Sequence, residues 1–283
     1  MLSKVFSIVL CGALFSVATL SASTELKAQS DIAGDVKLLA HKAVYDVSLS
    51  EAKPSSTITS IKGQLTFTIS YDCAAWNTLY DFDLVYHFSD KPSAHVKTQT
   101  VTYEPANGEK YDFAMSHIIA GRKIEAMRGH AKKEQQGDSQ SIRASYTKPD
   151  AQEDVFEGSI IFPTEHSTEV ISRARAGQRF FSVDVFDGLE RKGVTTISTL
   201  VSQANPDDNT DANRFEGIDD TVAKWRVNMG YFMKGADKDM SEYELSATLY
   251  ETGVLSDIRL NYHDYVLKQD LSAFSVLETP DCP

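Results

Sequence analysis

Hydrophobic and polar residues alternate along most of this chain with a period of two. In the segment 64–72, "QLTFTISYD", apolar side chains fall at Leu65, Phe67 and Ile69, with threonine or serine between them. The segment 79–88, "LYDFDLVYHF", repeats the pattern with aromatic residues. Successive side chains of a β-strand point to opposite faces of its sheet, so this spacing predicts strands with one buried and one solvated face.

Turn signals separate the alternating runs. They contain proline, glycine, aspartate or asparagine and include "KPSS" at 53–56, "ANGEK" at 106–110, "EQQGDS" at 134–139 and "NPDDNTDAN" at 205–213. Strands spaced in this way favour an antiparallel sandwich, a barrel or a long coiled sheet over βαβ units. Because no linker separates blocks of different composition, we predict one mainly β domain over residues 24–283.

One segment beyond the N-terminal region predicts a helix. Residues 167–176, "STEVISRARA", place Val170, Ile171 and Ala174 at helical spacing, and Gly177 follows where a helix would end. We expect the hydroxyl of Ser167 or the adjacent threonine to cap the first turn. The helix is therefore predicted to begin near Ser167.

The residues just before this helix are the candidates for chemistry. A catalytic interpretation would use His166 as a general base oriented by the carboxylate of Glu165 or Glu169. The sequence offers no G-x-S-x-G motif or other activated nucleophile to go with it. We therefore predict no catalytic residue, with His166 just before the helix cap. Pro163, Glu165 and His166 remain candidates for the wall of a pocket at the helix start.

The N-terminus has the form of a secretory signal peptide. Lys4 is followed by an uncharged run from Val5 to Leu20 and then by small residues at 21–23. The run is shorter than the roughly 20 residues that a membrane-spanning helix needs. We predict that residues 1–23 are removed and that the mature protein is exported.

Cysteine usage changes once the signal peptide is removed. Cys11 lies inside the signal, and the Leu10 before it does not fit a lipoprotein cleavage site. Cys73 and Cys282 remain, and two thiols in an exported protein usually pair. No C-x-x-C motif supports a redox role, so a structural disulfide is expected. Closing nearly the whole mature chain in one loop contributes roughly 5 kcal/mol as an upper estimate.

Charge and metal-ligand spacing exclude several classes of function. The net charge of −12 makes nucleic acid and anionic membranes poor partners. The histidines are far apart and form no H-E-x-x-H motif, so we predict no metal and no cofactor. The acidic loop 205–220 carries several oxygen ligands but lacks the EF-hand register. A solvated loop is the preferred interpretation, and weak calcium binding is the alternative.

Several segments together resemble the EipB-type cell envelope integrity proteins of alphaproteobacteria. The resemblance covers nearly the whole mature chain in order and is weakest from Glu190 to Arg214. The segments that carry it are "LLAHKAVYDVSLS", "YDCAAW", "FEGSIIFPTEH", "RARAGQRFFSVDVFDG", "LNYHDYVLKQDL" and "TPDCP".

The resemblance implies a periplasmic protein of a Gram-negative cell with a role in envelope integrity and resistance to envelope stress. It also implies a long antiparallel sheet wound as a β-spiral around the helix near Ser167, and a disulfide between Cys73 and Cys282. No enzymatic activity defines that family. We expect a non-enzymatic protein that binds an envelope protein or a lipid or glycan component. The alternative is a periplasmic hydrolase or lipid carrier with a pocket near His166.

Overall fold

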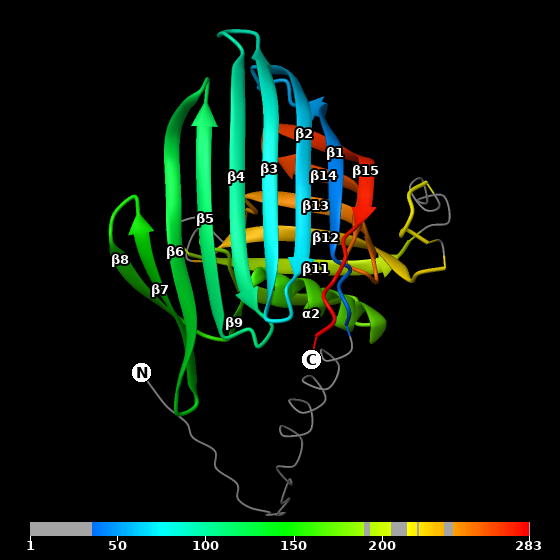
Figure 1. The fold of residues 1–283 in the computed structure, drawn as a ribbon. Helices are drawn as coiled ribbons and strands as arrows, with labels where there is room; N and C mark the ends of the chain where they lie inside the picture. Colours follow the sequence, from blue (N-terminus) through cyan, green and yellow to red (C-terminus); the bar gives the residue numbers. More distant parts are fainter. Residues whose placement is uncertain (1–35, 190–192, 205–213, 220, 235–239, 283) are drawn as a thin grey trace, which may run out of the picture. The chain divides into compact units, whose positions relative to one another are not determined.

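The computed structural model describes residues 36–189, 193–204, 214–219, 221–234 and 240–282. These residues form one sheet of fifteen strands and one helix, α2 (Figure 1). The elements are β1 His41–Ala52, β2 Ile58–Tyr71, β3 Ala75–Phe88, β4 Ala94–Pro105, β5 Lys110–Ile119, β6 Arg122–Gln136, β7 Ser139–Lys148, β8 Gln152–Glu157, β9 Ile160–Ile161, α2 Pro163–Arg175, β10 Phe180–Phe186, β11 Val194–Gln203, β12 Lys224–Met233, β13 Tyr243–Tyr250, β14 Leu255–Tyr262 and β15 Tyr265–Val276.

The first and last strands of the chain, β1 and β15, pair with one another in the middle of the sheet. Strands β8 to β1 follow one another, β15 pairs with β1, and β14 to β9 complete the sheet. Neighbouring strands are antiparallel except at one end, where β9 and β10 pair in parallel. This confirms the predicted long antiparallel sheet, with a parallel pair at its end that the alternation did not indicate.

Aromatic packing brings the two ends of the sheet together and nearly closes it. Tyr111 and Phe113 of β5 pack against Phe162 and Phe186, with ring centroids 5.2 Å apart for Tyr111 and Phe162 and 5.8 Å for Phe113 and Phe186. Strands β7 and β9 are also in contact. The sheet therefore curls into a nearly closed, barrel-like form.

Two glycines permit the close approach at this closure. Gly188 and Gly193 both have positive φ angles, 68° and 81°. A Cβ added to Gly188 would lie 2.5 Å from the ring of Phe113, and one added to Gly193 would lie 2.1 Å from the ring of Phe156. Both the backbone conformation and the available space thus require glycine.

Helix α2 fills one end of the space that the sheet encloses. Its buried residues Val170, Ile171 and Ala174 belong to the main hydrophobic core, together with Tyr45 of β1 and Leu65 of β2. In Figure 1 the helix lies at the lower ends of the strands β1–β4, below β11. The predicted winding of the sheet around one helix is confirmed.

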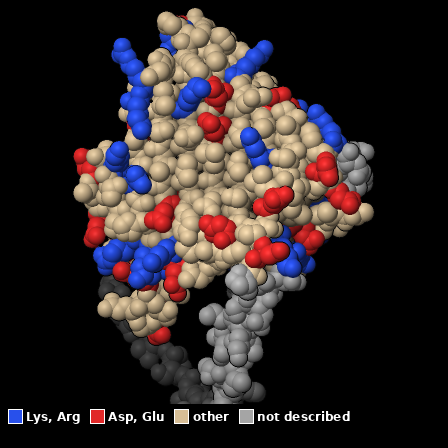
Figure 2. All heavy atoms as spheres, in the orientation of Figure 1, with Lys and Arg blue, Asp and Glu red and all other residues tan. Residues whose placement is uncertain are grey.

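The outer face of the front strands carries mixed charge. Figure 2 shows basic and acidic side chains interspersed over this face, with uncharged surface between them. The net negative charge of the chain is therefore not gathered into one patch on this side. Within the described ranges, no helix has the length and apolar character needed to cross a membrane.

Candidate functional site at the start of helix α2

Helix α2 begins four residues earlier than the sequence predicts. Pro163 occupies the first turn and Phe162 is the N-cap residue. The prediction of a start near Ser167 is wrong because proline suits the first turn, where its missing N–H would have no partner within the helix. The Ser167 hydroxyl instead donates to the Pro163 carbonyl oxygen at 3.1 Å, and the Thr168 hydroxyl donates to that of Glu165 at 2.8 Å.

The end of the helix agrees with the prediction. Gly177 has a φ of 75°, and its N–H donates to the Ala174 carbonyl at 3.0 Å. The N–H of Gln178 donates to the Arg173 carbonyl at 2.9 Å. These two bonds form the Schellman arrangement that a glycine in the left-handed conformation favours.

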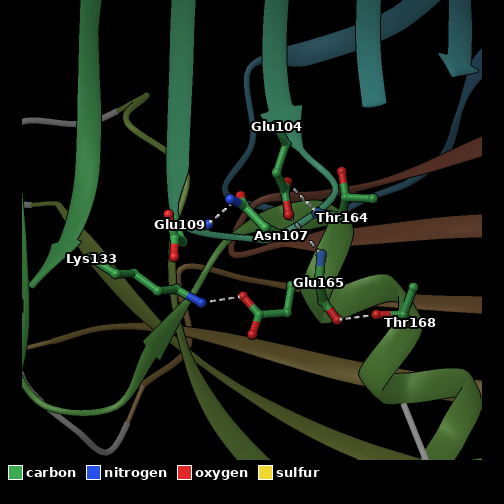
Figure 3. A network of polar contacts seen from close by, with 7 residues as sticks. All are labelled: Glu104, Asn107, Glu109, Lys133, Thr164, Glu165 and Thr168. Carbon is green, nitrogen blue, oxygen red and sulfur yellow. Dashed lines mark hydrogen bonds and ion pairs between the residues drawn. The ribbon is translucent and has the colours of Figure 1, made fainter. Parts of the chain in front are cut away.

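A carboxylate from β4 caps the start of the helix in place of a local hydroxyl. Glu104 is only 3% exposed. Its two oxygens accept hydrogen bonds from the backbone N–H groups of Thr164 at 2.8 Å and Glu165 at 3.0 Å (Figure 3). Burial raises the pKa of the Glu104 carboxyl above its usual value, more than these hydrogen bonds lower it. Glu104 therefore joins β4 to α2 directly.

One feature of the sequence pointed to this contact, although Glu104 lies 60 residues before Thr164 in the chain. Glu104 occupies an inward position of β4, in register with the buried Thr100 and Thr102. A carboxylate on the buried face of an alternating strand requires a partner. Alternation cannot identify that partner, because the helix comes from a distant part of the chain.

Glu165, a candidate pocket residue, forms an ion pair. Its carboxylate lies 2.5 Å from the Lys133 ammonium of β6, and both side chains are partly exposed (Figure 3). The same ammonium lies 5.3 Å from the centre of the Phe162 ring. Glu104 and Glu165 thus attach the first turn of α2 to β4 and β6, two strands from the first half of the chain.

His166, the residue considered as a general base, lies inside the helix rather than before its cap. Its backbone N–H donates to the Phe162 carbonyl at 2.8 Å, and its side chain is buried at 8% exposure. Its Nε2 atom is buried and has no hydrogen-bond partner among the described residues. Burial lowers the pKa of His166 to about 4, so the imidazole is neutral near pH 7. This environment gives a general base no orienting group at Nε2.

We expect His166 to make the fold sensitive to acid. Its pKa is lowered from 6.5 to about 4, so the unfolded chain binds the proton more tightly than the folded protein. The stability it contributes is complete above pH 6.5 and is lost as the pH falls from 6.5 to about 4. The loss amounts to up to about 3 kcal/mol in the free energy of unfolding.

Chemical denaturation of the parent and of His166→Gln across this pH range measures the effect. The slope of stability against pH should be smaller in the variant, whatever its stability at neutral pH. His130→Gln, which changes an exposed histidine, is the matched control variant. Parallel slopes for the parent and His166→Gln would contradict the prediction.

The predicted disulfide is present. Cys73 and Cys282 are bonded, with their Cα atoms 5.4 Å apart. Cys73 lies in the turn between β2 and β3, and Cys282 lies in the tail beyond β15. The bond therefore attaches the C-terminal tail to the end of an early hairpin.

Two surface hollows lie away from the predicted pocket. One, of about 440 Å³, is lined by residues of β4, β5, β6 and β7, including Tyr103 and Arg128. The other, of about 400 Å³, is lined by residues of β1 and β12–β15, including Arg259. Neither includes Pro163, Glu165 or His166 in its lining. A ligand site at the helix start stays a prediction.

The prediction of no metal site and the alternative of calcium binding by the loop 205–220 concern different parts of the chain. The part that the structure describes contains no group of three or more histidine, cysteine or acidic residues placed to hold a metal ion. Most of the acidic loop 205–220, including residues 205–213, lies outside the described residues, as does the predicted signal peptide 1–23.

Comparisons with known proteins give consistent results. A family model described as EipB-like matches residues 32–278. The cell envelope integrity protein EipB of Brucella abortus (strain 2308) is 28% identical over 252 residues, which cover 87% of each chain. A crystal structure of a β-barrel-like protein of a domain of unknown function, also from Brucella abortus, has a TM-score of 0.77 and 26% identity. That similarity covers 86% of this chain and the whole of the other.

Proposed function

Because this chain belongs to the EipB-like family, we propose that it is an exported protein that maintains the integrity of the cell envelope. We further propose that residues 1–23 are a signal peptide and that residues 24–283 form a single periplasmic domain. The protein acts by binding an envelope protein or a lipid or glycan component, without catalysing a reaction. The match over residues 32–278 is the observation that carries this proposal.

Two features of the molecule support export and a binding role. A disulfide closes a loop of 209 residues, and such bonds persist outside the reducing cytoplasm. The similar protein from Brucella abortus is named for cell envelope integrity and aligns with this chain over 87% of both. Together they favour a periplasmic protein whose function depends on a stable, nearly closed sheet.

The hydrolase alternative receives less support from the helix start. A general base works best with a pKa near the operating pH and an orienting partner. The pKa of His166 is about 4, and no described residue forms a hydrogen bond with its buried Nε2. Glu165 is paired with Lys133, and Glu104 holds the backbone of α2. These groups stabilise the helix and are poorly placed to activate water.

Deletion of the gene in its own organism tests the envelope role. We expect the deletion strain to be more sensitive than its parent to detergent and to antibiotics that act on the cell wall. The full chain should restore resistance. A form limited to residues 24–283, which lacks the predicted leader, should be made in equal amount and fail to restore it.

The same strains also show how the proposal fails. Unchanged resistance after deletion would contradict the envelope role. Full restoration by the leaderless form would contradict the need for export. Hydrolysis of lipid or peptidoglycan fragments by the purified protein, if abolished by His166→Ala in a folded variant, would favour the hydrolase alternative.

A further inference from the structure

The larger of the two surface hollows, of about 440 Å³, lies over β4, β5, β6 and β7. We call it the outer-face hollow; the polar side chains in its lining are Tyr103, Asp112, Arg128, His130 and Thr147. In each strand these positions alternate with buried residues, such as Phe113 of β5 and Tyr146 of β7. The hollow therefore opens to solvent on the face of the sheet opposite to the buried Glu104.

Strand pairing brings the polar side chains of the hollow together. Tyr103 of β4 is the cross-strand partner of Asp112 of β5, and Asp112 is the partner of His130 of β6. Arg128 occupies the neighbouring outward position of β6. Residues directly opposite one another in antiparallel strands have Cβ atoms about 4.5–5.5 Å apart. A phenol, a carboxylate, an imidazole and a guanidinium thus share one small area.

A small side chain and a β-bulge shape this area. Ala114 of β5 is the partner of Val101 on one side and of Arg128 on the other, so the methyl group lies below its larger neighbours. The register between β6 and β7 shifts after Arg128, which leaves Thr147 as an extra residue in β7. Bulges of this kind often lie next to functional sites, where they redirect a side chain. The hollow thus has an apolar floor and a bulged wall.

The two charged groups of opposite sign in the hollow do not pair. Within the described ranges, no hydrogen bond or ion pair involves the side chain of Asp112 or that of Arg128. On the same outer face, by contrast, the Arg143 guanidinium of β7 lies 2.9 Å from the Glu134 carboxylate of β6. The hollow therefore keeps a strong acceptor and a strong donor available for a ligand.

The second hollow differs because its polar groups already interact with one another or with nearby residues. The Arg259 guanidinium donates to the Ser50 hydroxyl at 3.3 Å, and the Asn261 amide donates to the Glu244 carboxylate at 3.3 Å. A ligand would have to replace these hydrogen bonds, which reduces the net gain from binding. The outer-face hollow is thus the stronger candidate for a binding site.

The charges in the outer-face hollow select the class of ligand. An anion would be repelled by the carboxylate of Asp112, and a cation would be repelled by the guanidinium of Arg128. A purely apolar ligand would remove both groups from water without giving them partners, which is costly. A sugar hydroxyl can donate to the carboxylate and accept from the guanidinium. The charges therefore favour an uncharged, polyhydroxylated ligand.

The apolar part of the lining fits the same class of ligand. Val101, which is 48% exposed, and Ala114 lie side by side, and Tyr103 flanks them on β4. No other aromatic ring of the described residues contacts the Tyr103 ring. Tyrosine supplies a large, rigid contact area at a small cost in conformational entropy. The carbon-bound hydrogens of a sugar ring can pack against this surface while its hydroxyls meet the charged groups.

His130 does not form a catalytic arrangement with its neighbours. It is the cross-strand partner of both Asp112 and Ser145, residue types that hydrolases combine. In the described part of the chain, however, no hydrogen bond joins His130 to either residue. The Ser145 hydroxyl instead donates to the Glu153 carboxylate at 3.2 Å. This geometry favours binding over hydrolysis, because an activated nucleophile needs a base within hydrogen-bond reach.

We propose that the outer-face hollow binds uncharged sugar units of an envelope glycan. Asp112 and Arg128 form hydrogen bonds with the sugar hydroxyls, and Tyr103 with Val101 contacts the apolar face of the ring. The inference rests on the proposed function, because it selects the glycan among the envelope components that the protein would bind. It places the glycan on the outer face of β4–β7, away from His166.

Isothermal titration calorimetry of the oxidised protein, residues 24–283, with chitotetraose and with laminaritetraose tests the inference. The first is a chain of N-acetylglucosamine and the second a chain of glucose, so the tighter binder identifies the kind of glycan. At least one should bind with a Kd of about 1 mM or lower. Arg128→Met removes the donors but keeps a side chain of similar length. It should weaken binding about tenfold or more, since hydrogen bonds to charged groups are the strong ones.

Matched variants separate loss of a ligand contact from a general change of charge. Arg143→Met removes the same charge from the same face but outside the hollow, and it should change binding by less than about twofold. Tyr103→Ala should weaken binding about tenfold, whereas Tyr103→Phe keeps the ring and should stay within about threefold of the parent. If Arg128→Met melts far below the parent, Arg128→Gln replaces it with the same expected loss.

Defined outcomes would overturn the inference. They are the absence of binding by the folded parent to both sugars at about 10 mM, an equal loss for Arg143→Met and Arg128→Met, or binding of the zwitterion alanylalanine in place of the sugars. Release of shorter sugars during the titration would overturn binding without hydrolysis. Because this assay uses purified protein, its failure leaves the envelope role intact if the full chain still restores resistance in cells. Conversely, sugar binding without any envelope phenotype would overturn the proposed function alone.

Discussion

Loss of the Cys73–Cys282 disulfide is expected to lower the free energy of unfolding by up to about 5 kcal/mol, because the bond closes a loop of 209 residues. In the chain-entropy description, the bridge removes conformations from the unfolded state, and the reduction in entropy grows with loop length. The folded state should change little, since Cys282 lies in an exposed tail beyond the last strand. Denaturant unfolding of oxidised and reduced protein measures the difference.

The variant in which both Cys73 and Cys282 are serine provides the control. It should unfold at the same denaturant concentration with and without reductant, and close to the reduced parent. Circular dichroism should report the same strand content in all samples, since the sheet does not depend on the bridge for its pairing. Coincident unfolding of the oxidised and reduced parent would refute a stabilising role for the disulfide.

Glu104→Ala is expected to lower stability by about 2–4 kcal/mol, the second largest effect. The substitution removes the acceptor for the backbone N–H groups of Thr164 and Glu165. It leaves these donors unpaired next to a buried void, and each loss of this kind costs about 1–3 kcal/mol. Because the cap also joins β4 to α2, the first turn of the helix should open before the rest. Hydrogen exchange at the Thr164 and Glu165 amides measures that local effect.

Two variants test whether the cap, rather than a general loss of charge, is responsible for the lower stability. Glu109→Ala removes an exposed carboxylate from the neighbouring hairpin and should leave stability within about 0.5 kcal/mol of the parent. Glu104→Gln keeps one acceptor oxygen and should fall between the parent and Glu104→Ala. A stability of Glu104→Ala equal to that of Glu109→Ala would show that the two hydrogen bonds contribute nothing.

The cap and the disulfide lie near one another at the same end of the sheet, because Trp76, three residues after Cys73, pairs with Glu104. Glu104 and the Lys133–Glu165 pair hold α2 against β4 and β6, while the disulfide holds the tail against the β2–β3 turn. Their contributions to stability should therefore be coupled, and a variant that lacks both the disulfide and the Glu104 carboxylate measures the coupling.

The alternation of residues along the chain was sufficient to predict the strands and their buried faces. Leu65 and Ile69 are buried where the period of two places them. Gly177 ended the predicted helix correctly, because a left-handed residue after a helix is a local requirement. The pairing of Cys73 with Cys282 followed from export and from the number of thiols, so it needed no knowledge of the fold.

Contacts between distant segments of the chain could be identified only from the folded structure. Alternation assigns a side chain to a face but does not say which other element that face will meet. Neither the capping of α2 by Glu104 nor the packing of Tyr111 on Phe162 could therefore be read from spacing. The helix start was misplaced for the same reason, since a carboxylate from β4 fulfils the role expected of a local hydroxyl. Local patterns thus determined the elements, whereas the closing of the sheet determined the helix cap.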